Sequence, residues 1–313
     1  MRYATGNRGP MMSRIAAQAF SHLPPAAGRL GAAMARPKRL AIACILALTA
    51  LGWVYLALLI AHMGGTLAAL GPGMGALDLI PRVFAALCRP TFGLAMPTGT
   101  WSPGAFAVVA LMWAAMVFAM MLPSAGPMIL TYAEIAETAA KKRQPIVSPL
   151  LIAAGYTTAW LGFALFATFV QFVLTQAVLI DEGMASTSLL FSGTIFIGTG
   201  LYQFSALKHA CLKQCQSPFA FFFTHWQTSA QGVFRLGLRQ GLYCLGCCWA
   251  MMLVMFAVGV MNVIWMAVLG LIMTLEKIVG GRLLSNIFGG ALIAFGIAFV
   301  LAGVAGHWPF ATI

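Results

Sequence analysis

Long apolar runs, separated by polar or Gly- and Pro-rich stretches, dominate the chain and predict membrane-spanning helices. The runs lie at about residues 40–60, 106–132, 149–174, 188–207, 237–258, 263–276 and 283–304. Most of them reach the roughly 20 residues that a helix needs to cross the hydrocarbon core of a bilayer. We therefore predict an all-α fold, a polytopic transmembrane helical bundle of about seven spans.

The distribution of basic residues predicts an orientation. Of the 18 Lys and Arg residues, only Arg82 and Arg89 fall in outer segments if the amino terminus is cytoplasmic. Cytoplasmic loops carry an excess of Lys and Arg, so we expect the amino terminus inside. Two regions follow: a mobile cytoplasmic tail, residues 1–38, and a transmembrane helical domain, residues 39–313.

Composition agrees with this class. Hydrophobic residues make up 61% of the chain and charged residues 8%, whereas a soluble domain carries roughly a quarter charged residues. The net charge of +12 is explained by the inner segments, so we expect membrane lipids and no nucleic acid as partners. The seven cysteines are odd in number and lie mostly on the reducing side, which is not a disulfide framework.

The fifth predicted span carries the most evident chemistry. Cys244, Cys247 and Cys248 enter an apolar helix, and Met251 follows. At about 100° per residue, Cys244, Cys248, Met251 and Met255 share one stripe. One buried Cys or Met is ordinary apolar filler, but three cysteines in five positions favour function. Soft sulfur ligands indicate a soft metal ion or a thiol redox centre.

The second predicted span offers further sulfur atoms and a distorted backbone. Met120 and Met121 precede Pro123 and Pro127. Each proline lacks an amide hydrogen, so the helix must bend or open. Broken spans form ion sites in many transporters, although a simple kink is the alternative. Met121 has a similar expected depth to Cys248, and we predict that the two helices face each other there.

Cys211 and Cys215 are four residues apart, which places both thiols on one face of a helix. Such a pair can chelate one ion, and nearby lysines favour the thiolate. The alternative is a basic juxtamembrane segment with incidental cysteines.

Three further residues have predicted structural roles. Gly241 lies four residues after another glycine and would allow close approach of a second helix. Asn262 is expected to cap the sixth helix. Glu276 is expected to be an interfacial anchor or to pair with Lys277 or Arg282.

Three ordered motifs resemble a bacterial family of predicted metal-binding integral membrane proteins, catalogued as domain of unknown function 2182. They read AMMLPSAGPMILTYAE at 119–134, GLYQFSALKHACLKQCQSP at 200–218, and GLYCLGCCWAMMLVMFAVGVMNVIWMAVLGLIMTLEK at 241–277. The likeness covers a core of roughly residues 105–280. It implies a multi-pass protein of the bacterial inner (plasma) membrane that binds a metal.

The resemblance points to a set of residues within these motifs: Met120, Met121, Pro123, Ser124, Pro127, Tyr202, Lys208, Cys211, Cys215, Tyr243, Cys244, Cys247, Cys248, Trp249, Met261, Asn262, Glu276 and Lys277. Relatives often have a histidine just before the glycine that precedes the cysteine motif, where this chain has Gln240.

Three functions fit these observations. The first is binding and transport or delivery of a soft transition metal, with a metallochaperone or another membrane subunit as partner. Thiolate and thioether ligands together favour Cu(I) over Zn(II). The second is a membrane thiol-disulfide oxidoreductase that uses Cys244 and Cys247, with a quinone as electron partner. The third is a non-catalytic subunit or assembly factor. We favour the first, which is not an enzyme.

Overall fold

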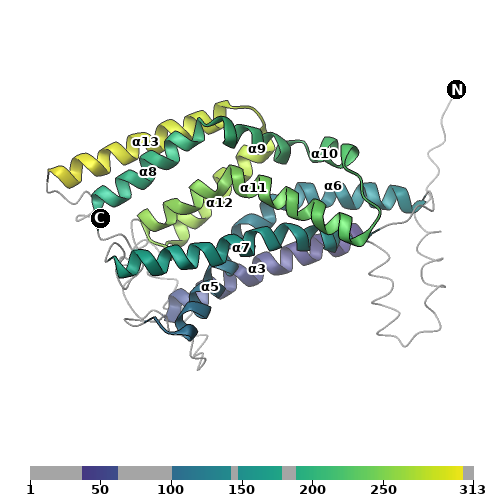
Figure 1. Ribbon diagram of the computed structural model, residues 1–313, viewed down its shortest axis with the longest axis horizontal. Helices are drawn as coiled ribbons and strands as arrows, with labels where there is room; N and C mark the ends of the chain where they lie inside the picture. The colour runs from purple at the N-terminus through teal and green to yellow at the C-terminus, as the bar shows by residue number, and fades with distance from the viewer. Residues whose placement is uncertain (1–36, 63–100, 142–146, 178–187, 306–313) are drawn as a thin grey trace.

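The computed structural model describes residues 37–62, 101–141, 147–177 and 188–305, and these ranges contain helices and no strands (Figure 1). The helices are α3 (Pro37–His62), α5 (Pro103–Met116), η3 (Val117–Met121), α6 (Leu122–Lys141), α7 (Pro149–Gln176), α8 (Leu189–Gln203), α9 (Ala206–Gln216), α10 (Pro218–Thr224), α11 (Ala230–Val258), α12 (Val263–Val279) and α13 (Leu283–Val304). The predicted all-α fold class is confirmed. The tail up to residue 36 and the loop at 63–100 lie outside the described residues.

Every predicted apolar run contains a helix. Within the described ranges, α3, the α5–η3–α6 segment, α7, α11 and α13 are long and apolar enough to cross a membrane. The helices α8 and α9 together pass the same test, but they are bent by 64° at the break between them. The described residues therefore contain five or six candidate spans. The count of seven and the side of the amino terminus stay predictions.

The caps explain where several helices begin. Ser148 accepts a hydrogen bond from Leu150 N, and Pro149 then occupies the first helical turn, where its missing amide hydrogen costs nothing. Ser229 accepts from Gly232 N, so α11 begins seven residues before the predicted start at 237. Asn262 accepts from Trp265 N and caps α12, as the sequence predicts.

The predicted distortion of the second span is a π-helical turn. The Leu122 amide donates to Val117 O, one residue further back than in an α-helix, immediately before Pro123. The Ser124 hydroxyl donates to Met121 O at 2.8 Å. The helix then continues through Pro127. The extra residue of the π-turn shifts the helix faces that follow it and exposes the Met121 carbonyl to a second partner.

Glycines determine how closely α7 and α11 cross. A β-carbon added at Gly237 would lie 2.2 Å from Ile152 O, and one at Gly241 would lie 2.8 Å from Tyr156 O. Any side chain at these positions would push the two helices apart. The crossing therefore holds Tyr156 of α7 directly against the cysteine-bearing turn of α11.

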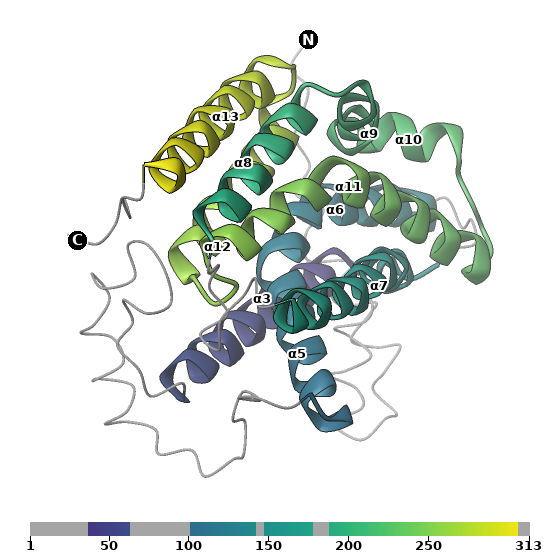
Figure 2. The ribbon, with the colours of Figure 1, turned by 60° about the vertical axis from the view of Figure 1, so that its left-hand side comes forward.

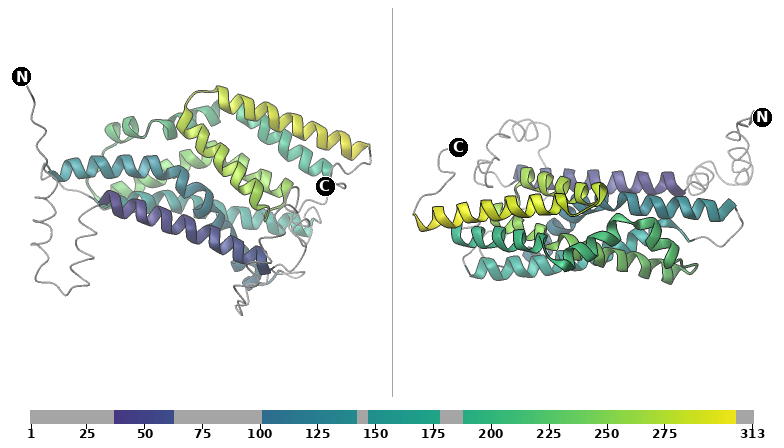
Figure 3. Two further views of the ribbon diagram at one scale, coloured as in Figure 1. Left: turned by 180° about the vertical axis from the view of Figure 1, so that it is seen from behind. Right: turned by 90° about the horizontal axis from the view of Figure 1, so that it is seen from above.

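The helices α8 and α13 lie side by side at one edge of the bundle, and α3 lies on the opposite side (Figures 1 and 3). The short helices α9 and α10 cover one end of α11, with α12 and α6 nearby (Figure 2). This arrangement surrounds the first half of α11 with α7, α9 and α12, the three helices that supply the site described next.

Candidate metal centre

Three cysteine thiols from two helices converge. Cys215 lies at the end of α9, and Cys244 and Cys247 lie one turn apart on α11. Their three sulfur atoms all lie within 4.8 Å of one another. Cys244 and Cys247 are buried, and Cys215 is half-buried with its Sγ 4.0 Å from that of Cys247. This spacing brings potential ligands from separate parts of the chain within reach of one ion.

The other predicted sulfur ligands lie around this group rather than in it. Cys248 Sγ is 3.3 Å from Cys247 Sγ. Met251 Sδ accepts a hydrogen bond from Gln203 Nε2 at 2.8 Å, so it faces α8. The Cys211 sulfur lies over Gly246, 2.6 Å from where a β-carbon would stand. The structure thus groups Cys244 with Cys247 and Cys215. The helix face predicted from the sequence grouped Cys244 with Cys248 and Met251 instead.

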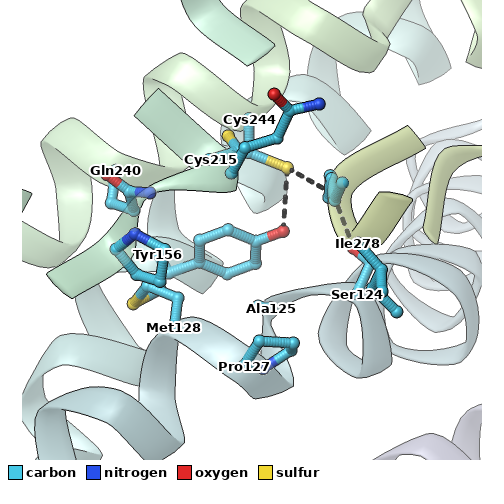
Figure 4. A pocket seen from close by; sticks show the side chains of 12 residues that line it. Ser124, Ala125, Pro127, Met128, Tyr156, Cys215, Gln240, Cys244 and Ile278 are labelled. Atoms are coloured by element: carbon cyan, nitrogen blue, oxygen red, sulfur yellow. Dashed lines mark hydrogen bonds between the residues drawn. The ribbon is translucent and has the colours of Figure 1, made fainter. Parts of the chain in front are cut away.

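Cys244 is held by polar groups from two other helices. Lys277 Nζ of α12 donates to Cys244 Sγ at 3.1 Å and to Ser124 Oγ of α6 at 2.7 Å. The Tyr156 hydroxyl lies 3.0 Å from Cys244 Sγ and 3.2 Å from Met121 O, and its single hydrogen goes to the sulfur when Cys244 is a thiolate (Figure 4). The helices α7, α11 and α12 therefore meet at one sulfur atom.

A charged Lys277 at this buried point would be balanced by an ionised Cys244 thiol. Lys277 is 8% exposed. The ion pairs found among the described residues are Lys38 with Glu134 and Lys208 with Glu276, and neither includes Lys277. A buried ammonium without an anion is costly. A thiolate at Cys244 supplies that anion, and the thiolate is the form that binds metals.

The expected pairing of Glu276 with Lys277 or Arg282 is wrong. Glu276 accepts from Lys208 Nζ at 2.9 and 2.8 Å, with both side chains buried. Gln216 Nε2 adds a hydrogen bond to the Glu276 carbonyl at 2.7 Å. The reason is the packing of α9 against α12, which brings a lysine distant in sequence beside this carboxylate. Nor is Glu276 at an exposed interface.

The methionines of the second predicted span contribute less sulfur than expected. Met120 packs against Gly270 of α12, and Met121 contributes its carbonyl oxygen rather than its sulfur. Instead, Tyr156 and Lys277 lie between this span and Cys244 and join the two.

A cavity of about 340 Å³ opens beside Cys244. Its walls come from α6, α7, α9, α10, α11 and α12. The lining residues with chemical groups of interest are Ser124, Met128, Tyr156, Cys215, Gln240, Cys244 and Lys277 (Figure 4). Pro127 also lines it. The cavity gives a ligand access to two of the three clustered thiols.

A sequence model of the copper chaperone family PpoB2 matches residues 110–299, which is more than half of the chain. The chain belongs to this copper chaperone family. The match begins within α5 and ends within α13, so it contains all the cysteines of the site. It agrees with the metal-binding part of the resemblance found in the sequence, although the matching family carries another name. No curated protein and no solved structure matches the chain.

One residue of this copper chaperone family member had no sequence signal. Tyr156 stands in an apolar run without any motif, and only the close crossing of α7 over α11 brings its hydroxyl to Cys244. Lys277 and Ser124 were within the resembling motifs, but their contact with Cys244 was not predicted. Gln240 lines the cavity, and its Nε2 donates to Gln214 O at 3.2 Å.

Proposed function

We propose that the chain binds Cu(I) at the sulfur atoms of Cys215, Cys244 and Cys247 and passes it on within the membrane. Copper is then the cargo of the protein. The observation that carries the proposal is the convergence of three thiols within 4.8 Å, with an ammonium group 3.1 Å from the sulfur of Cys244. Membership in a copper chaperone family supports the choice of metal.

The ligand chemistry favours Cu(I) over Zn(II). Thiolates are soft ligands and suit Cu(I). Structural Zn(II) sites almost always have four ligands, whereas the group found among the described residues consists of three cysteines. If one of the three sulfurs binds as a neutral thiol, the positive charges of Cu(I) and of Lys277 balance the other two thiolates, and the loaded site is neutral. Neutrality removes most of the cost of burying the ion.

The buried Lys277 ammonium is also evidence against the alternative that the cysteines only fill space in the helix packing. Neutral thiols would leave the buried Lys277 ammonium with no anion within its described contacts. A non-catalytic subunit would have no use for that arrangement. A ligand site uses it directly, because it keeps one thiolate ready for the incoming ion.

Transfer requires further ligands next to the first. Cys248 Sγ lies 3.3 Å from Cys247 Sγ, and Cys211 lies against the same turn of α11 at Gly246. We propose that copper moves among these thiols by ligand exchange toward the buried methionines of α11. The protein would work in the bacterial inner membrane with its amino terminus in the cytoplasm. A metallochaperone or another membrane subunit would be its partner.

Metal content tests the proposal. The protein is purified under reducing conditions without chelators, and its metals are measured by mass spectrometry. We expect copper in the wild type and almost none in the variant with Cys244→Ser and Cys247→Ser. The matched control is Cys44→Ser, which removes a free cysteine of α3 outside the cluster. Equal copper in the double variant and the wild type would refute the proposal.

A redox function is the second candidate, because Cys215 Sγ and Cys247 Sγ lie 4.0 Å apart. A disulfide between them would release two protons and two electrons to an acceptor such as a quinone. The structure favours this pair over Cys244 and Cys247 of the sequence hypothesis. Trapping with a thiol reagent in growing cells distinguishes the two functions: an oxidised Cys215–Cys247 pair supports redox chemistry, and free thiols support copper binding.

A further inference from the structure

We infer that the cavity beside Cys244 receives copper as a complex with a small thiol peptide, not as a bare ion. This inference rests on the proposed function and names the form of its cargo. The cavity measures about 340 Å³, whereas one water molecule takes roughly 30 Å³ of liquid volume. Pockets for small organic ligands begin near about 300 Å³. The space is therefore that of an organic ligand.

The cavity opens at the protein surface near the end of α12. Ile278, which lines it, is 64% exposed, and Pro127 of α6 is also exposed. Pro218, the first residue of α10, lines it as well. Cys244, by contrast, is buried. A ligand that enters beside Ile278 would therefore meet the reactive sulfur at the inner side of the cavity.

Gln240 offers the cavity an unused acceptor. Its side chain is 2% exposed, and its Nε2 donates to Gln214 O at 3.2 Å. Its Oε1 has no hydrogen-bond partner among the described residues. A buried amide oxygen without a donor costs free energy, and the backbone N–H of a peptide would satisfy it. A metal ion alone would leave Gln240 Oε1 without a hydrogen bond, unless this oxygen became a ligand of the metal.

Lys277 offers the cavity a cation. An ammonium group has three N–H donors, and the described contacts of Lys277 use two, to Ser124 and Cys244. The carboxylate of a small peptide could accept from the third. The lining thus combines a cation, an amide acceptor and the two thiols Cys215 and Cys244. This set complements an anionic peptide thiolate that carries Cu(I).

The transfer is a ligand exchange without a redox change. A cysteine sulfur forms a bond to Cu(I) as the bond between Cu(I) and the peptide sulfur breaks. Cys244 binds as a thiolate, and the proton that a second cysteine of the group gives up as it binds goes to the departing peptide thiolate. Copper stays Cu(I), so no electron acceptor is needed, and the neutral thiol leaves through the opening beside Ile278.

The test compares loading rates from two copper donors, the complex with reduced glutathione and the much smaller complex with acetonitrile. The variant Ile278→Trp narrows the opening at an exposed position. The matched control is Val279→Trp, whose position is 63% exposed and does not line the cavity. We expect Ile278→Trp to slow loading from glutathione at least about tenfold by steric exclusion. For the same variant, the rate of loading from the acetonitrile complex and the final copper content should stay at the wild-type level.

A second measurement uses a competitor that carries no copper. S-methylglutathione cannot bind copper through a thiolate, but it keeps the peptide amides and carboxylates. We expect it to slow loading from the glutathione complex in a saturable way, and Gln240→Leu to weaken this competition. Equal loading by both tryptophan variants, or no competition, would overturn the inference while a copper-binding wild type still upholds the proposed function. A wild type without copper would overturn both.

Discussion

The two lysines that are buried among the described residues, Lys208 and Lys277, have different kinds of partner. Lys208 of α9 donates to both carboxylate oxygens of Glu276, at 2.9 and 2.8 Å. Lys277 follows Glu276 directly in the sequence of α12, but it donates to Ser124 Oγ and Cys244 Sγ. Adjacent residues on a helix differ by about 100° in direction, so one turn of α12 serves two separate sites.

The difference shows which lysine is structural. A carboxylate beside an ammonium holds a fixed negative charge, so the pair of Lys208 and Glu276 attaches α9 to α12 permanently. A thiol carries charge only when it loses its proton. Lys277 therefore stabilises a charge that depends on the state of Cys244, which is what a metal site requires. Changes at the first pair should affect folding, and changes at the second should affect copper.

The largest effect is expected when one partner of the structural pair is removed. Glu276→Gln leaves the Lys208 ammonium buried without an anion. We expect the free energy of unfolding to fall by about 3–5 kcal/mol, as measured by thermal and denaturant unfolding of the purified protein in detergent.

The control for this prediction removes both charges. Replacing Lys208 by Met together with Glu276 by Leu leaves no unpaired charge, so we expect stability near that of the wild type. If the double variant is as unstable as Glu276→Gln, the pairing is not what makes this region sensitive, and the contrast between the two lysines fails.

A smaller effect, on copper rather than on folding, is expected for Lys277→Met. Without the ammonium, Cys244 would stay protonated, and Cu(I) would have to displace that proton. Loss of a group that supports a metal ligand typically lowers affinity by about 10–100-fold. Competition with a coloured Cu(I) chelator measures it. An unchanged Cu(I) affinity would show that Lys277 does not act on the thiolate.

The smallest effect is expected for Tyr156→Phe, which removes the hydroxyl 3.0 Å from Cys244 Sγ. One hydrogen bond contributes about 1 kcal/mol, so we expect Cu(I) affinity to fall several-fold. The matched control is Tyr132→Phe, because that hydroxyl donates to Val147 O, away from the thiols. Equal losses in both variants would place the effect in general packing.

Sequence alone was sufficient for the helices and for part of the site. Apolar runs mark each long helix because burial in lipid or protein requires them. Three cysteines in five positions marked α11 as the centre, and Asn262 marked the start of α12. The start of α11 was missed because its first turns carry Gln231, Gly232 and Arg235 and are not uniformly apolar.

The rest of the site depends on contacts between distant segments. Lys208 and Glu276 are 68 positions apart, and no local sequence pattern pairs them. The partners predicted for Glu276, Lys277 and Arg282, are close to it in the sequence. Helical spacing gave Cys211 and Cys215 equal weight, and only the packing of α9 on α11 places Cys215 in the group of three thiols. Tyr156 reaches Cys244 because glycines let α7 and α11 cross closely, and a single sequence does not predict which residues meet at such a crossing.

X-ray absorption at the copper edge of the Cu(I)-loaded protein tests the central claim most directly. The account predicts Cu(I) surrounded by sulfur alone in the wild type and in Cys44→Ser, and loss of that sulfur shell when Cys215, Cys244 and Cys247 are all changed to Ser. A shell of nitrogen or oxygen in the wild type, or an unchanged sulfur shell in the triple variant, would contradict it.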